Sequence, residues 1–199
     1  MRLIGLTGGI ASGKSTVTKY LLKKGFVVID CDKITADLYK NNEEFIGGLV
    51  SLFGGSIMEK GKVSKKKVAS IVFNNADELQ KLNSYAFPFL ISEILYQIDF
   101  NSSEEVVFID APVLFEYGLH EVLSFTDIWV VSVSRTVQIE RLKKRNPDLS
   151  EKDILDRLNK QWSDETKCAL STYIITNKGT IADLYRKVDM GISSLRTDL

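Results

Sequence analysis

The stretch GGIASGKST, residues 8–16, has the spacing of a phosphate-binding loop. It fits the pattern G-x-x-x-x-G-K-[ST] through Gly8, Gly13, Lys14 and Ser15. Glycines let backbone N–H groups curl around a phosphate, and the helix expected next adds partial positive charge. The lysine can reach the β- and γ-phosphates, and the serine hydroxyl can ligate Mg²⁺. The motif therefore predicts a nucleoside triphosphate site that contains Gly9, Ala11, Ser12, Gly13, Lys14, Ser15 and Thr16.

Two carboxylates, Asp30 and Asp32, follow an apolar run in the stretch VVIDCDKI. Because they are two residues apart, they would point to the same side of an extended chain. One carboxylate near the γ-phosphate could accept the proton of an attacking hydroxyl, while the other could help to arrange Mg²⁺ through water. We expect Asp32 to be the base and Asp30 the supporting group. The alternative is that one or both aspartates cap the next helix.

A third group of charged residues lies in VQIERLKKRNPD, where Arg141 and Arg145 are four residues apart and share one helix face. A phosphoryl transition state spreads negative charge over its oxygens, and arginines aimed at them stabilise it. We therefore expect Arg141 to act in catalysis and Arg145 to contact the nucleotide. The alternative is a solvated basic helix end that favours the helix dipole.

Five short apolar runs must position these groups. Most are continuous rather than alternating, as in strands that are buried on both faces of a parallel sheet. Helical patterns separate them, and this alternation predicts an α/β fold with a five-stranded parallel sheet between helices. The ligand should then bind at the carboxyl ends of the strands. The predicted strands are Leu3–Leu6, Phe26–Asp30, Val106–Asp110, Asp127–Val133 and Thr172–Thr176.

Two segments differ from this core. Residues 34–100 contain no convincing strand and have apolar residues at helical spacing, so we expect an inserted helical lobe, with a turn or short hairpin in GGSIMEKGKVSKKK. Residues 143–166 are dense in charge, with a predicted helix cap at Ser150, and are expected to form a helical lid. The nucleotide-binding core should then comprise residues 1–33 and 101–199.

The composition excludes some partners. The chain has 199 residues, and 26 basic side chains balance 26 acidic ones, so no global field attracts nucleic acid or an anionic membrane. No apolar run approaches the length of a membrane-spanning helix, and the apolar run in MRLIGLTGG is too short for a signal peptide. The two cysteines, Cys31 and Cys168, lack metal-ligand spacing. We expect a cytoplasmic protein that is a monomer or a weak homo-oligomer.

Several classes of phosphate-loop protein compete for this sequence. A regulatory GTPase would need D-x-x-G after a strand, but Ala111, Pro112 and Val113 follow Asp110. The late stretch NKGT begins like the base-reading motif N-K-x-D and ends in threonine. A small-molecule kinase fits better, because a lid excludes water from the phosphoryl group. The alternatives are a kinase acting on a nucleoside monophosphate or a shikimate-like alcohol, and a regulatory nucleotide-binding protein.

Over nearly its whole length the chain resembles the dephospho-CoA kinase family. The matching segments are LTGGIASGKSTV, VIDCDKI, FGGSIMEKGKVSKKKVASIVF, QKLNSYAFPFL, APVLFEYGL, QIERLKKRN, LNKQW and ITNKG. The resemblance implies a phosphate-loop kinase fold with a helical substrate domain and a lid. It also implies ATP-dependent phosphorylation of the ribose 3′-hydroxyl of dephospho-CoA, the last step of coenzyme A synthesis, with ATP and Mg²⁺.

The resemblance also implies roles for individual residues. Asp32 matches the family's proposed base, Arg141 a lid-side arginine near the ATP phosphates, and Asn177 the loop that lines the adenine. Two departures are visible: Phe87 stands where the family usually has histidine, and Lys65 stands where many members have an arginine facing the substrate. The expected substrate contacts are Thr7, Asp32, Lys65, Pro112 and Phe115.

Overall fold

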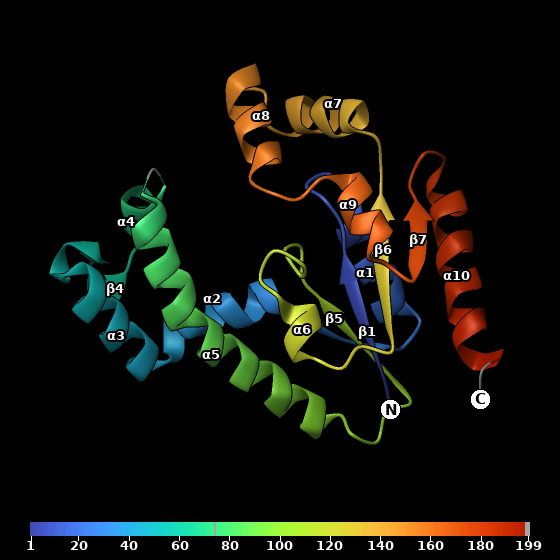
Figure 1. Cartoon of the computed structure of the whole chain (residues 1–199), viewed down its shortest axis with the longest axis horizontal. Coiled ribbons are helices and arrows are strands. Elements are labelled where there is room, and N and C mark those ends of the chain that lie inside the picture. Colours follow the sequence, from blue (N-terminus) through green and yellow to red (C-terminus); the bar gives the residue numbers. More distant parts are fainter. Residues whose placement is uncertain (74, 198–199) are drawn as a thin grey trace. The chain divides into compact units, whose positions relative to one another are not determined.

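A parallel sheet of five strands forms the centre of the α/β part of the molecule, in the order β2-β5-β1-β6-β7 (Figure 1). The structure, a computed structural model, describes residues 1–73 and 75–197. The α/β fold and all five predicted strands are confirmed, with end points that differ by at most one residue. The strands are β1 (Arg2–Thr7), β2 (Val27–Asp30), β5 (Val106–Asp110), β6 (Asp127–Ser132) and β7 (Tyr173–Thr176).

The register of the sheet brings the ends of three strands together. Leu6 of β1 pairs with Asp110 of β5, and Thr7 pairs with Val130 of β6. Because the pairing is parallel, the segments that follow β1, β5 and β6 all leave the sheet at the same edge. This edge holds the phosphate-binding loop.

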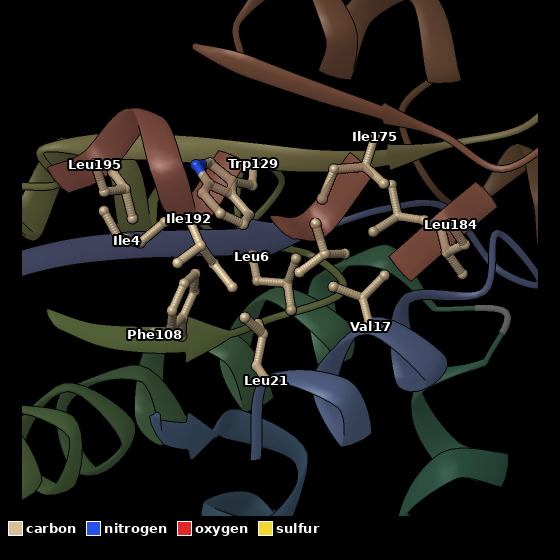
Figure 2. Close-up of a cluster of buried hydrophobic side chains, with 12 residues drawn as sticks. Ile4, Leu6, Val17, Leu21, Phe108, Trp129, Ile175, Leu184, Ile192 and Leu195 are labelled. Carbon is tan, nitrogen blue, oxygen red and sulfur yellow. The ribbon is translucent and has the colours of Figure 1, made fainter. Parts of the chain in front are cut away.

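Two helices bury apolar residues against the sheet. The helix α1 (Lys14–Lys23) contributes Val17 and Leu21, and α10 (Ile181–Thr197) contributes Leu184 and Ile192 (Figure 2). These side chains pack with the strand residues Ile4, Leu6, Phe108, Trp129, Val131 and Ile175. A buried aliphatic side chain contributes about 1.5–3 kcal/mol. This core therefore fixes the start of α1, where the phosphate-binding loop ends.

The chain forms two compact units. The first comprises residues 1–29 and 102–199, and the second comprises residues 30–101. The second unit is helical apart from one two-stranded hairpin, where the sequence predicts a turn or short hairpin. Phe45 is fully buried in this unit and contacts the rings of Tyr39, Tyr85 and Phe89. Its elements are α2 (Cys31–Asn41), α3 (Glu43–Phe53), η1 (Gly55–Ile57), β3 (Met58–Glu59), β4 (Lys62–Val63), α4 (Lys65–Val72) and α5 (Ala76–Phe100).

The first unit also contains the helices α6 (Leu119–Val122), α7 (Arg135–Arg145), α8 (Glu151–Asn159) and α9 (Asp164–Ala169). The helix α6 precedes β6, whereas α7, α8 and α9 lie between β6 and β7. The helices α7 and α8 lie beyond the end of the sheet towards which β6 and β7 point (Figure 1). The predicted cap at Ser150 is present as a reciprocal capping box with Asp153 at the start of α8.

Candidate active site

The phosphate-binding loop runs from the end of β1 to the start of α1 and contains a tight turn. The Ser12 N–H donates to the Gly9 carbonyl at 3.0 Å, so Ile10 and Ala11 form the tip of the turn. Ala11 has φ of +60°, a left-handed conformation that costs a residue with a Cβ roughly 1–2 kcal/mol. Gly13 has φ of +99° directly before α1. Such strained loops persist when their surroundings hold them in place.

Lys14 begins α1 and pairs with Asp110 at the end of β5. The second oxygen of this carboxylate accepts a hydrogen bond from the Thr18 hydroxyl at 2.6 Å. Asp110 is only 4% exposed, so a positive partner and a hydroxyl donor together offset the cost of burying its charge. The pair holds the predicted phosphate-binding lysine at the carboxyl ends of two neighbouring strands.

The carbonyl groups of the loop are bound by side chains from distant elements. Arg141 of α7 donates from Nη1 to the carbonyls of Ala11 and Ser12, both at 3.1 Å, and from Nη2 to the Asn177 carbonyl at 3.3 Å. Asn177, which follows β7, is buried and donates from Nδ2 to the Ser12 carbonyl at 2.7 Å. A Cβ at Gly13 would collide with this amide. Arg141 and Asn177 thus join the loop, α7 and β7.

Two glutamines bind the backbone of Ile10. Gln138 of α7 donates from Nε2 to the Ile10 carbonyl at 2.9 Å, and Gln161, between α8 and α9, accepts from the Ile10 N–H at 2.8 Å. Ile10 and Ala11 also pack against a small apolar cluster formed by Leu142, Ile154 and Leu158. The contacts with the loop therefore come from α7 as well as from residues 143–166, the range predicted for the lid.

The segment after β5 is tied to the same region. The Pro112 carbonyl accepts hydrogen bonds from the Thr7 hydroxyl at 3.2 Å and from Lys167 of α9 at 2.9 Å. Lys167 is fully buried and pairs with Glu116 at 2.8 Å. Glu116 also accepts from the Trp162 N–H at 2.9 Å. Two of the predicted substrate contacts, Thr7 and Pro112, are thus joined to each other by a hydrogen bond.

Phe115, another predicted substrate contact, is 2% exposed. Its ring is parallel to that of Trp162 at 6.3 Å between centroids and meets His120 edge-on at 5.1 Å. His120 is only partly exposed. In this conformation Phe115 packs inside the protein, between the segment after β5 and the segment before α9.

The two aspartates of VVIDCDKI lie in different elements. Asp30 ends β2 and caps α2, because its carboxylate accepts from the Lys33 N–H at 3.0 Å. Asp32 is exposed in the first turn of α2, which begins at Cys31. The expectation that both point to the same side of an extended chain is wrong, because the strand ends at Asp30. The alternative that Asp30 caps the next helix is confirmed.

The remaining predicted residues lie at the surface of their own elements. Ser15 is exposed in the first turn of α1, and Thr16 is half-buried there. Arg145 is exposed at the end of α7. Lys65 is exposed at the start of α4, with its ammonium 4.9 Å from the centroid of the Tyr39 ring. Lys65 therefore makes a cation–π contact within the helical unit.

Two caps next to the site depend on ionised carboxylates. The hydrogen bond from the Ser150 hydroxyl lowers the pKa of Asp153 at the start of α8. The hydrogen bond from the Thr180 hydroxyl likewise lowers the pKa of Asp183, which caps α10 just after the loop that carries Asn177. The spacing of Thr180 and Asp183 in the sequence is that of a capping box, and hydrogen bonds in both directions confirm it.

Several residues of this site are not found by sequence reasoning. Asp110 is visible only as a charge at the end of an apolar run, although that position in a parallel sheet favours a ligand-facing group. Gln138, Gln161 and Lys167 have no local signal, because their partners are 128, 151 and 55 residues away. Gln161 does lie in LNKQW, one of the segments on which the family resemblance depends.

The part of the chain that the structure describes contains no group of three or more His, Cys, Asp or Glu side chains placed to hold a metal ion. Among the described helices, none combines the length and the apolar character needed to cross a membrane.

Comparisons with known proteins show which family the chain belongs to. A family model described as Dephospho-CoA kinase matches residues 2–183. The dephospho-CoA kinase of Fusobacterium nucleatum is 38% identical over 192 residues, which cover 94% of this chain and 95% of that protein. The one from Streptococcus pneumoniae is 35% identical over 199 residues, 99% of this chain and 98% of that protein. The structure of dephospho-CoA kinase from Campylobacter jejuni matches with a TM-score of 0.73 and 26% identity over 100% of both chains. The chain therefore belongs to the dephospho-CoA kinase family.

Proposed function

We propose that the protein transfers the γ-phosphoryl group of ATP to the ribose 3′-hydroxyl of dephospho-CoA, giving coenzyme A. The observation that carries the proposal is the family match over residues 2–183, because it spans the phosphate loop, the helical unit and α7–α9 together. As a member of this family the protein is a kinase.

The loop and Lys14 bind the triphosphate in this proposal. Its N–H groups and the amino end of α1 supply partial positive charge to the phosphates. Lys14 leaves Asp110 and pairs with the β- and γ-phosphates, since a charged phosphate oxygen is an equally good partner for an ammonium group. The nucleotide contacts are Gly9, Ala11, Ser12, Gly13, Lys14, Ser15, Thr16, Arg145 and Asn177.

Magnesium fits the oxygen donors present. The Ser15 hydroxyl is exposed at the amino end of α1. Mg²⁺ prefers oxygen ligands and usually takes one or two from the protein, with water and phosphate oxygens completing its shell. We propose that Ser15 would hold the ion directly and Asp30 through water. When bound, Mg²⁺ neutralises charge on the transferred phosphoryl group.

Transfer needs a base for the acceptor hydroxyl, and we propose Asp32. Its carboxylate accepts the proton of the ribose 3′-hydroxyl while the hydroxyl oxygen forms a bond to the γ-phosphorus. The bond between this phosphorus and the β,γ-bridging oxygen breaks, and ADP leaves with the electron pair. The proposed substrate contacts are Thr7, Asp32, Lys65, Pro112 and Phe115. Arg141 is proposed as the cation that supports this step from α7.

We propose that the enzyme works in the reducing cytoplasm, because its sequence has only two cysteines, Cys31 and Cys168, too few for a disulfide scaffold. We also propose that it is a monomer or a weak homo-oligomer.

A coupled assay of ADP release tests the function. With ATP and Mg²⁺, release should depend on dephospho-CoA and should be at least about 100-fold slower without it, since water is the only other acceptor. Adenosine monophosphate and shikimate serve as control acceptors and should leave the background rate unchanged. Release that is equally fast with no acceptor, or that requires one of the controls, would contradict the proposal.

A further inference from the structure

Ile10, at the tip of the phosphate-binding loop, has both of its backbone polar groups bonded to side chains from other elements. We propose that Gln138 and Gln161 are positioning residues that clamp Ile10, so that the α7–α9 segment sets the conformation of the phosphate loop. The inference rests on the proposed function for its kinetic consequences, but the clamp itself is a property of the protein without nucleotide.

The backbone of Ile10 determines which atom each glutamine must present. A backbone N–H can only donate, so Gln161 must place its oxygen at this position, 2.8 Å away. A carbonyl can only accept, so Gln138 must place its NH₂ group there, at 2.9 Å. One glutamine therefore accepts a hydrogen bond from Ile10 and the other donates one to it. The same substitution should then have different effects at the two positions.

The clamp is built into a mostly apolar setting. Gln138 is only 7% exposed, so its amide would be buried without this hydrogen-bond partner if the Ile10 carbonyl moved away. Ile10 and Ala11 pack against Leu142 and Ile154, so α7, which carries Gln138, and α8, which precedes Gln161, also enclose the tip of the loop. Both kinds of contact favour one position of the turn relative to α7 and α8.

Gly9 is part of the clamp, because a Cβ at this position would lie 2.6 Å from Nε2 of Gln138. The motif requires glycine at Gly8 and Gly13 but not at Gly9. Glycine at this third position lets the Gln138 amide reach the loop backbone. A Gly9→Ala substitution should therefore push Gln138 away from Ile10 while leaving the required glycines and the lysine of the motif in place.

The clamp matters for phosphoryl transfer because the turn precedes the N–H groups that surround the phosphates. The strained Ala11, with φ of +60°, directly follows Ile10, and Ser12 and Gly13 come next. A shift of about 1 Å in a positioning element can cost up to 100-fold in rate. Loss of one of the two hydrogen bonds corresponds to a change of roughly 10-fold.

Amide hydrogen exchange of Ile10, measured by NMR without nucleotide, tests the clamp directly. The Ile10 amide should be protected in the wild type and should exchange about 10-fold faster or more in Gln161→Ala. Gln161→Glu should keep the protection, because a carboxylate oxygen also accepts the hydrogen bond. The matched control is Gln80→Ala, which removes an exposed glutamine of α5 and should leave the exchange at Ile10 unchanged. Wild-type exchange at Ile10 in Gln161→Ala would overturn the proposal.

Steady-state kinetics test the consequence for the reaction. Gln138→Ala and Gln161→Ala should each lower kcat by about 10-fold, with the KM for ATP changed by less than about 3-fold. An effect on the KM alone, or a kcat within about 2-fold of wild type in both variants, would contradict the positioning role.

If an alanine variant does not fold, the variants Gln138→Glu and Gln161→Glu test the clamp instead. Gln138→Glu places a carboxylate against the Ile10 carbonyl, so it should disturb the loop, whereas Gln161→Glu should keep the Ile10 amide protected. Equal exchange rates in the two glutamate variants would overturn the proposal. If the wild type fails to phosphorylate dephospho-CoA, the proposed function fails, yet the exchange at Ile10 still tests the clamp.

Discussion

The ammonium group of Lys14 pairs with the carboxylate of Asp110, which joins the start of α1 to the end of the neighbouring strand β5. Both side chains are largely buried, with 14% and 6% of their side-chain surfaces exposed. The lysine that the motif assigns to phosphate thus has an anionic partner within the protein. Phosphate oxygens would replace one negative partner with another, so Lys14 need not be left without a partner at any stage.

The pair predicts a stability effect of Asp110→Asn. Removing one charge from a buried pair leaves the other uncompensated, so the free energy of unfolding should fall by about 3 kcal/mol in urea denaturation. Saturating ATP with Mg²⁺ should narrow this gap, because the phosphates then pair with Lys14. The control is Glu151→Gln, which removes an exposed pair with Lys143 and should cost less than about 1 kcal/mol. An equal loss of unfolding free energy in the two variants would show that the buried pair contributes no more than the exposed pair.

The proposed base predicts a kinetic effect of Asp32→Asn. Turnover should fall by about 100-fold, the usual scale for loss of a general base, while ATP binding stays nearly intact. Binding of ATP by calorimetry and turnover of dephospho-CoA should be measured on the same preparation. Asp37→Asn, on the exposed surface of the same helix, is the matched control and should turn over at the wild-type rate. Near-normal turnover in Asp32→Asn would end the assignment.

The contacts of Arg141 predict that its removal lowers kcat more than it changes the KM for ATP. Its guanidinium holds three carbonyl groups of the loop and of Asn177 in one arrangement, so Arg141→Ala should lower turnover by about 10- to 100-fold and affect the KM for ATP less. Arg141→Lys should not restore turnover, because a lysine cannot reproduce the planar fork of donors. Lys144→Ala, an exposed change in the same helix, is the control. An unchanged kcat with a raised KM would assign Arg141 to ground-state binding.

The cap of α10 predicts a pH dependence. The folded protein lowers the pKa of Asp183 below its ordinary value of 3.8, chiefly through the Thr180 hydroxyl. A carboxyl group with a lowered pKa contributes stability above its unfolded pKa and loses it as the pH falls through the folded value. The stability difference between wild type and Asp183→Asn should therefore be constant from neutral pH down to about 5 and should shrink below about 4. A difference that is independent of pH down to about 2 would contradict this role.

The fold could be predicted from the sequence because the patterns that indicate it involve residues close together in the chain. Runs such as Val106–Asp110 are apolar without alternation, which is the pattern of a strand buried on both faces. The phosphate loop is equally local, since Gly8, Gly13 and Lys14 lie within seven residues. Helix caps at Ser150 and Thr180 also act over three residues, and the structure contains both.

The surroundings of the loop could not be predicted, because they depend on contacts between distant parts of the chain. Gln138 and Gln161 are ordinary polar residues of helical segments until the fold brings them to Ile10. The spacing of Asp30 and Asp32 resembles that of two residues on one side of a strand. The N-cap formed by Asp30 ends the strand two residues before Asp32, so Asp32 lies in the first turn of α2.

Identification of the product tests whether the ribose 3′-hydroxyl of dephospho-CoA accepts the phosphoryl group. ATP, Mg²⁺ and dephospho-CoA should be incubated with wild type and with Lys14→Ala, and the acceptor product should be located by phosphorus NMR and mass spectrometry. A single new phosphate monoester should form on the ribose 3′-oxygen, in step with ADP, and the rate should be at least about 100-fold lower in the Lys14 variant. ADP without a phosphorylated acceptor, or a phosphate on any other atom of dephospho-CoA, would contradict the proposed function.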